Sequence, residues 1–126
     1  MKAKITSQYA PAAVGPYSQA VETQSLVFLS GQIGLIPETG SLAEGGIAGQ
    51  TKQALQNLQA VLHAAGLSAD HVVKTTVFLT DMQDFKTVND LYGQFFTGVC
   101  PARSCVSVRS LPLNALIEIE AIAVRP

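Results

Sequence analysis

Residues Ile117 to Val124 read IEIEAIAV, and this strict alternation decides the fold class of the chain. Successive side chains of a β-strand point to opposite faces, so every second residue here shares a face. One face is apolar and carries Ile117, Ile119, Ala121 and Ala123. The other face mixes carboxylates with large apolar groups, at Glu118, Glu120, Ile122 and Val124. The pattern predicts a strand with one face on the core and the other face free for a second contact.

The segment before this strand supplies positive charge. This segment reads PARSCVSV from Pro101 to Val108 and continues with Arg109. By strand alternation, one of its faces carries Arg103, Cys105, Ser107 and Arg109. We expect this strand to neighbour the Glu118 strand, so that an arginine fork and an acid converge on one cleft at a subunit boundary. A plainer interpretation stands beside it, because cross-strand arginine–glutamate pairs on exposed sheets are common and contribute little.

The rest of the chain predicts two helices and further strands. Apolar residues recur with helical spacing from Ile47 to Ala65, and Gly66 ends this helix. A second helix follows Asp84, a candidate N-cap, and ends at Gly98. The remaining apolar runs are short and β-branched, at Tyr17–Val21, Leu26–Ser30, Val72–Thr80 and Ser104–Val108. The order β-β-α-β-α-β-β predicts an α+β fold in a single domain, residues 1–126, with both helices on one face of one sheet.

Composition narrows the classes of function. Hydrophobic residues make up 48% of the 126 residues and charged residues only 13%, which favours an oligomer that covers part of its apolar surface. The net charge is −1 and no run of Lys or Arg occurs, so we expect no nucleic-acid binding. No apolar stretch is long enough for a membrane span or typical of a signal peptide, so we expect a cytoplasmic protein.

Cysteine and histidine offer no metal or disulfide framework. Cys100 and Cys105 are the only cysteines, and neither His63 nor His71 belongs to a ligand cluster. No histidine is placed beside Cys105 in the sequence, so we interpret Cys105 as part of a pocket wall rather than a nucleophile. We expect neither a metal nor an organic cofactor.

Several motifs carry a family resemblance. PARSCVSV followed by IEIEAIAV closely resembles the C-terminal signature of the RidA (YjgF) family of enamine/imine deaminases. The segments APAAVGPYSQA (10–20), SGQIG (30–34), VVKTTVFLTD (72–81) and FKTVND (85–90) resemble other motifs of the same family. The resemblance spans nearly the whole chain.

The resemblance implies a homotrimer with a chorismate-mutase-like fold and active sites in the clefts between subunits. It implies that Arg103 binds the substrate carboxylate and that Glu118 orients or activates water. It also implies that Tyr17, Ser30, Gly31 and Cys105 line the pocket, with Asn89 near the site. The implied reaction is hydrolysis of 2-imino acids to 2-oxo acids and ammonia, which protects pyridoxal-phosphate enzymes from reactive intermediates.

These residue types suit that chemistry. The planar arginine fork can hold a carboxylate through two parallel charge-assisted bonds, and a carboxylate can accept the proton of an attacking water. Two alternatives of other classes remain open at this stage. One is a ribonuclease or translation inhibitor, and the other is a trimer that only binds small molecules.

Overall fold

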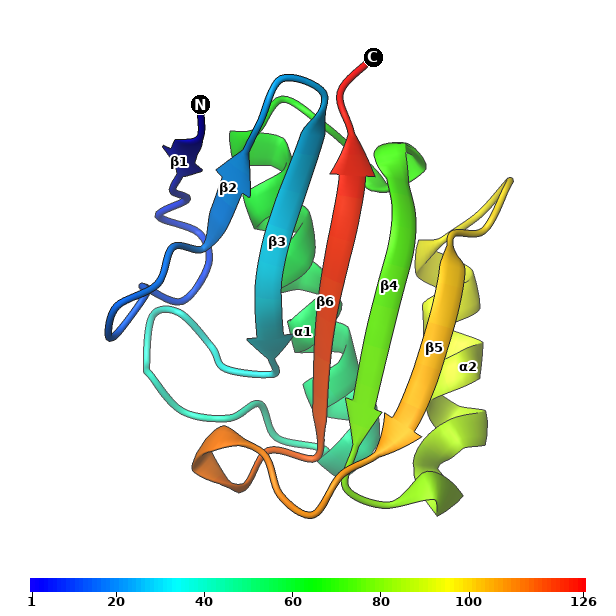
Figure 1. The fold of residues 1–126 in the computed structure, drawn as a ribbon. Coiled ribbons are helices and arrows are strands. Elements are labelled where there is room, and N and C mark those ends of the chain that lie inside the picture. Colours follow the sequence, from blue (N-terminus) through cyan, green and yellow to red (C-terminus); the bar gives the residue numbers. More distant parts are fainter.

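The computed structural model describes all residues, 1–126, as one six-stranded sheet with two helices packed on one of its faces (Figure 1). The strands are β1 (Ala3–Ile5), β2 (Ala20–Glu22), β3 (Leu26–Ile33), β4 (Val72–Leu79), β5 (Ala102–Ser107) and β6 (Ile117–Val124). The helices are α1 (Gly46–Ala64) and α2 (Phe85–Phe95), and three short 3-10 turns lie at 69–71, 82–84 and 112–114. The predicted α+β class is confirmed.

The order of strands across the sheet is β1-β2-β3-β6-β4-β5. All neighbours are antiparallel except β4 and β5, which are parallel and are connected through α2. The last strand of the sequence therefore lies in the middle of the sheet, and β5 lies at its edge. The prediction that the Arg103 strand and the Glu118 strand are neighbours is wrong, because β4 lies between them.

The core lies between the sheet and the helices. Its largest fully buried side chains come from α1, β4 and β6, and include Leu58, Leu62, Leu79, Ile117 and Ile119. The apolar face predicted for 117–124 is this core face, since Ile117, Ile119, Ala121 and Ala123 are all buried. The opposite face of the sheet carries no helix.

Element boundaries differ from the predictions in a few places. The first helix matches within one residue at each end, and Gly66 with a φ of 76° follows it. The second begins after Asp84 as predicted, but the Asp84 side chain caps nothing. A 3-10 turn at residues 82–84 precedes the helix, so the backbone amides that need a capping partner belong to this turn. The Asp81 side chain caps the turn by accepting a hydrogen bond from the Gln83 amide. Tyr17 lies in a turn before β2 rather than in a strand.

A buried glutamine holds the irregular N-terminal segment against the sheet. The Gln19 side-chain amide donates to the carbonyls of Ser7, Ala10 and Pro11, and its oxygen accepts the Ser7 amide at 2.6 Å. The polar groups of a segment without regular structure are thereby paired, as buried backbone requires. Both chain termini lie at the same end of the molecule (Figure 1). No helix is both long and apolar enough to cross a membrane.

Candidate active site

Arg103 is held rigidly between β5 and α2. Its side chain points to the helix face of the sheet, because Arg103 is paired with the buried Thr75 of β4. Its Nη1 donates a hydrogen bond of 2.7 Å to Asn89 Oδ1. The guanidinium carbon also lies 4.8 Å from the ring centre of Tyr92 and 5.4 Å from that of Phe85. An amide and two aromatic rings therefore fix the direction of the cation.

The positive charge of Arg103 has no carboxylate partner. The chain contains two ion pairs, Lys86–Asp90 and Arg125–Glu22, and neither involves Arg103. A half-buried guanidinium that keeps free N–H donors is a ready receptor for an anionic carboxylate.

Cys105 lies two residues along the same strand and on the same face as Arg103. Its side chain packs against the core, and this burial raises the pKa of the thiol, while the nearby Arg103 charge acts in the opposite direction. The thiol thus stays protonated at neutral pH, which agrees with a wall residue and not with a thiolate nucleophile.

Glu118 lies on the opposite, helix-free face of the sheet. It is paired with Ile33 of β3 and Phe78 of β4, so apolar residues flank it on both sides. Burial raises the pKa of the Glu118 carboxyl, and the like charge of Glu120 raises it further. No hydrogen bond or ion pair holds the carboxyl in the chain. Such a carboxylate is a better proton acceptor than one in open water.

Ser30 and Gly31 lie beside Glu118 in a β-bulge of β3. The pairing of β3 with β6 shifts by one residue between Leu29 and Gln32, so both Ser30 and Gly31 fit into the space of one residue. The Ser30 hydroxyl donates to the Ser18 carbonyl at 2.6 Å, which ties the turn that carries Tyr17 to this strand. Tyr17 itself is 54% exposed.

The predicted residues thus fall into two groups, which we call the arginine half (Arg103, Asn89 and Cys105) and the glutamate half (Glu118, Ser30, Gly31 and Tyr17). The two halves do not converge within one chain. Arg103 lies on the helix face and Glu118 on the open face, with β4 between their strands. The expectation of one cleft built from neighbouring strands is therefore wrong for the single chain.

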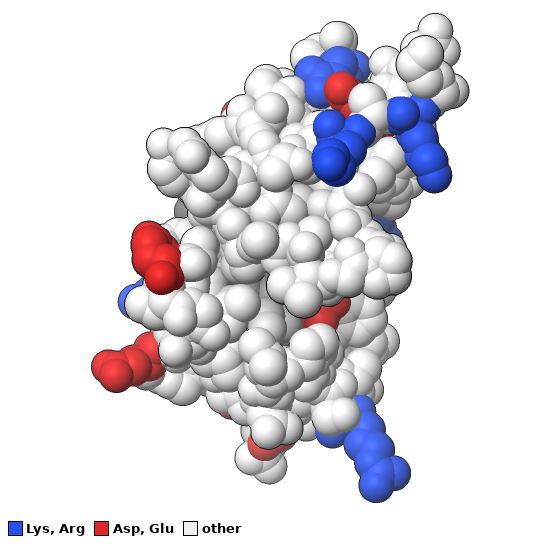
Figure 2. Space-filling view, turned by 90° about the vertical axis from the view of Figure 1, so that its left-hand side faces the viewer, with Lys and Arg blue, Asp and Glu red and all other residues white.

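The open face around the glutamate half is notably apolar. Phe28, Val73 and Val106 are 42%, 45% and 43% exposed on it. Figure 2 shows that charged side chains are also sparse on the side of the molecule at the β1 edge. Lys and Arg gather there mainly near the two termini, where Lys2 and Arg125 lie beside Glu22.

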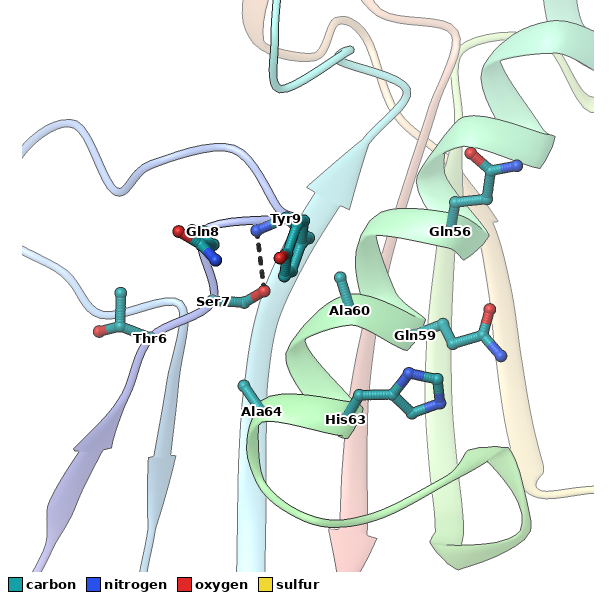
Figure 3. Close-up of a pocket in the computed structure, with 9 residues that line it drawn as sticks. All are labelled: Thr6, Ser7, Gln8, Tyr9, Gln56, Gln59, Ala60, His63 and Ala64. Atoms are coloured by element: carbon teal, nitrogen blue, oxygen red, sulfur yellow. Dashed lines mark hydrogen bonds between the residues drawn. The ribbon is translucent and has the colours of Figure 1, made fainter.

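A groove of about 770 Å³ lies elsewhere, between the N-terminal segment and the outer side of α1 (Figure 3). Tyr9 lines the groove from the N-terminal segment, and Gln56, Gln59 and His63 project from α1 (Figure 3). The groove contains no carboxylate and no arginine, and none of the predicted site residues lines it. It lacks the groups that imine hydrolysis requires.

Comparison with known proteins places the chain in a family. The family model described as endoribonuclease L-PSP, which represents the RidA (YjgF) proteins, matches residues 7–125. The chain belongs to the RidA (YjgF) family. The resemblance found in its motifs is confirmed.

Relatives of this RidA-family chain are close and cover almost all of it. Reactive Intermediate Deaminase A, chloroplastic, from Arabidopsis thaliana is 52% identical over 97% of this chain, which spans 65% of that longer protein. The 2-iminobutanoate/2-iminopropanoate deaminase of Mus musculus is 51% identical over 96% of this chain and 90% of its own. The crystal structure of Escherichia coli TdcF with bound serine has a TM-score of 0.94 at 46% identity, covering 98% of this chain and 99% of that one.

Sequence reasoning missed two structural features of the candidate site. The first is the pair of rings around Arg103, Phe85 and Tyr92, which share a face of α2 with Asn89 at spacings of four and three residues. That spacing was visible in the sequence and could have linked the three residues. The second is the bulge at Ser30–Gly31, for which the only sequence signal was a glycine inside a strand pattern.

Proposed function

We propose that the protein hydrolyses 2-imino acids, with their enamine tautomers, to 2-oxo acids and ammonia in a site shared between two copies of the chain. The observation that carries this proposal is the rigidly held guanidinium of Arg103, which lacks a carboxylate partner. A 2-imino acid presents a carboxylate beside an electrophilic C=N carbon. The names of the relatives support the reaction, and the serine bound to TdcF also carries an α-carboxylate.

Each half of the site has a distinct task in this reaction. Arg103 binds the substrate carboxylate through two parallel N–H donors, while Asn89 and Cys105 line its surroundings. Glu118 accepts a proton from water as the water oxygen bonds to the imine carbon, which gives a carbinolamine. Glu118 then returns this proton to the nitrogen and takes up the hydroxyl proton as the C–N bond breaks, so that ammonia leaves and the carbonyl forms. Tyr17, Ser30 and Gly31 line the side from which water attacks.

The active assembly is a homotrimer of a single domain, residues 1–126, with a chorismate-mutase-like arrangement. Two features support a shared site: the halves lie on opposite faces of the sheet, and the open face exposes Phe28, Val73 and Val106. In a closed ring with head-to-tail contacts, each copy offers its arginine half to one neighbour and its glutamate half to the other. Three equivalent sites result.

The biological task that fits this chemistry is the removal of 2-aminoacrylate and related enamines, which pyridoxal-phosphate enzymes release from serine or threonine. We place this activity in the cytoplasm. Two cysteines that form no disulfide are in keeping with a reducing compartment.

The test generates 2-iminopropanoate and 2-iminobutanoate in situ with a serine/threonine dehydratase and follows the release of the 2-oxo acid. The wild type should accelerate release strongly, while Arg103→Ala and Glu118→Gln should retain only a small residual rate. Arg109→Ala and Glu44→Gln are matched controls, because both residues are exposed and belong to neither half. Equal rates with and without the wild type would defeat the proposal. Cleavage of RNA, or binding of 2-oxo acids without acceleration, would then favour one of the alternatives.

A further inference from the structure

Two glycines of the segment Ser30–Gly34 are needed for different reasons. A side chain on Gly34 would meet the backbone of α1, with its Cβ 2.5 Å from the Gln50 carbonyl oxygen. A side chain on Gly31 would overlap the Glu118 carboxyl, and its three nearest atoms all belong to the Glu118 side chain. Gly34 therefore permits helix packing, whereas Gly31 leaves room only for Glu118.

The bulge explains how Gly31 comes so close to Glu118. On a regular ladder, Ile33 faces Glu118 directly and residue 31 would be a diagonal neighbour, at roughly 7–8 Å. The extra residue bends β3 at Ser30–Gly31 and turns both residues toward the open face. The place that a Cβ would fill is thereby occupied by the Glu118 carboxyl.

We infer that Gly31 is a positioning residue for Glu118, because the volume left by its missing side chain is the seat that holds the Glu118 carboxyl toward the attacking water. The inference rests on the proposed function, in which Glu118 accepts the water proton. It gives Gly31 a role beyond lining the pocket with its backbone. Gly31 acts through Glu118 and not on the substrate.

The surroundings of Glu118 leave this seat as its main restraint. No hydrogen bond or ion pair fixes the carboxyl, and the flanking residues Ile33 and Phe78 are apolar. The charged groups on the same face are Glu120 of β6 and Lys74 of β4, and Lys74 donates to Ser104 instead of Glu118. A carboxyl without hydrogen-bonding partners is positioned by the shape of its pocket, and desolvation in that pocket raises its pKa.

The chain offers a clean test, because Gly31→Ala should fold. The Gly31 backbone does not have a positive φ, and the atoms in conflict are those of a flexible side chain that can rotate away. Gly93→Ala is the matched control, since it is the same chemical change at an exposed helical position with no atom within 4 Å. The experiment compares kcat and KM for the wild type, Gly31→Ala, Glu118→Gln, the double variant and Gly93→Ala.

Gly31→Ala should lower kcat by about 10- to 100-fold with little change in KM, because a small misplacement of a catalytic group has effects of this size. In the Glu118→Gln background the same substitution should change the residual kcat by less than about twofold, since the group it displaces has already lost its function. The acid limb of the Gly31→Ala pH–rate profile should move to lower pH as the displaced carboxyl enters water. Gly93→Ala should match the wild type.

Crystal structures of the wild type and Gly31→Ala give a second reading that does not depend on activity. The Glu118 carboxyl should leave its seat in the variant while the backbone of β3 and β6 stays in place. A carboxyl in the same position in both structures would overturn the inference, as would an unchanged kcat or an equal fall in both backgrounds. If the wild type instead fails to hydrolyse imines, the proposed function is wrong, and the two structures still decide whether Gly31 seats Glu118.

Discussion

Arg103 and Glu118 lie on opposite faces of one sheet, on strands separated by β4. Their partners on β4 are Thr75 and Phe78, which are three residues apart, so the two side chains are also offset by roughly 10 Å along the strand. One chain therefore holds both halves of the proposed site without bringing them together. The number of chains per site becomes an experimental question.

Mixed oligomers answer that question directly. Arg103→Ala and Glu118→Gln chains, each with only a small residual rate alone, should regain activity when refolded together. In a random equal mixture, about one interface in four joins an intact Arg103 from one chain to an intact Glu118 from the other, so about a quarter of wild-type activity should return. The measurement is the rate of 2-oxo acid release. No recovery after confirmed subunit exchange would indicate that both residues act within the same chain.

Arg103→Lys should behave as a severe change. Lysine keeps the charge but lacks the planar pair of donors, and it cannot reproduce both the bond to Asn89 and two bonds to a carboxylate. Losing one charge-assisted hydrogen bond costs about 1.5–3 kcal/mol, which predicts a fall in kcat/KM of roughly 10- to 100-fold. Arg109→Lys, at an exposed arginine, should have no effect on the same kinetics.

The pH dependence of the reaction should report Glu118. Only the ionised carboxyl can accept a proton, so kcat/KM should fall by about tenfold per pH unit below the raised pKa of Glu118. Replacing Glu120 by Gln removes the smaller of the two causes of this shift and should move the acid limb to lower pH. An acid limb that persists unchanged in the residual activity of Glu118→Gln would mean that another group is responsible.

Stability should change in the opposite sense to activity when Glu118 is neutralised. The pKa of Glu118 is higher in the folded chain than in the unfolded chain, so this carboxyl favours folding below its unfolded pKa. That contribution is lost as the pH rises through the folded pKa. Glu118→Gln should therefore raise the midpoint of thermal unfolding at pH 7 relative to the wild type, with a smaller difference at pH 4. Differential scanning calorimetry at one protein concentration measures both values.

Two glycine substitutions should change stability in opposite directions. Gly34→Ala pushes its Cβ against the Gln50 backbone, which cannot rotate away, and should cost about 1–3 kcal/mol. Gly93→Ala replaces an exposed helical glycine in open space and should stabilise the chain by about 0.5–1 kcal/mol. Urea unfolding at a fixed protein concentration gives both values. A stable Gly34→Ala variant would show that α1 can shift away from β3.

Much of the fold could be predicted because its signals are local. The alternation in 117–124 and the helical spacing in 47–65 come from burial on one face, and burial imposes the same period on sequence and structure. β1 escaped prediction because three residues, Ala3 to Ile5, are too few to show a period. The order of strands is not local, and a sequence pattern does not say that β6 enters between β3 and β4.

The site was harder to predict for the same reason. Alternation shows which residues share a face with Arg103 in its own strand, and which share a face with Glu118 in its own strand. Whether the two side chains lie on the same face of the sheet depends on the order of the strands. The bulge adds a second difficulty. The buried residues of β3 are Val27 and Leu29 before the bulge and Gln32 after it. Regular alternation continued past Leu29 would place Gly31 on the buried face, whereas the bulge places Gln32 there. The family resemblance supplied a set of candidate residues, and it could not show which of them one chain brings together.

The shared location of the two termini has a consequence for protein engineering. Because the first and last residues lie at one end of the molecule, a short linker could join them. New ends could then be opened between Thr39 and Gly40, which are exposed in a turn outside every strand and helix. A circular permutant of this design would leave β3, β5 and β6 uncut. The order in which the strands are synthesised would then change, while the strands that carry the candidate site residues would stay intact.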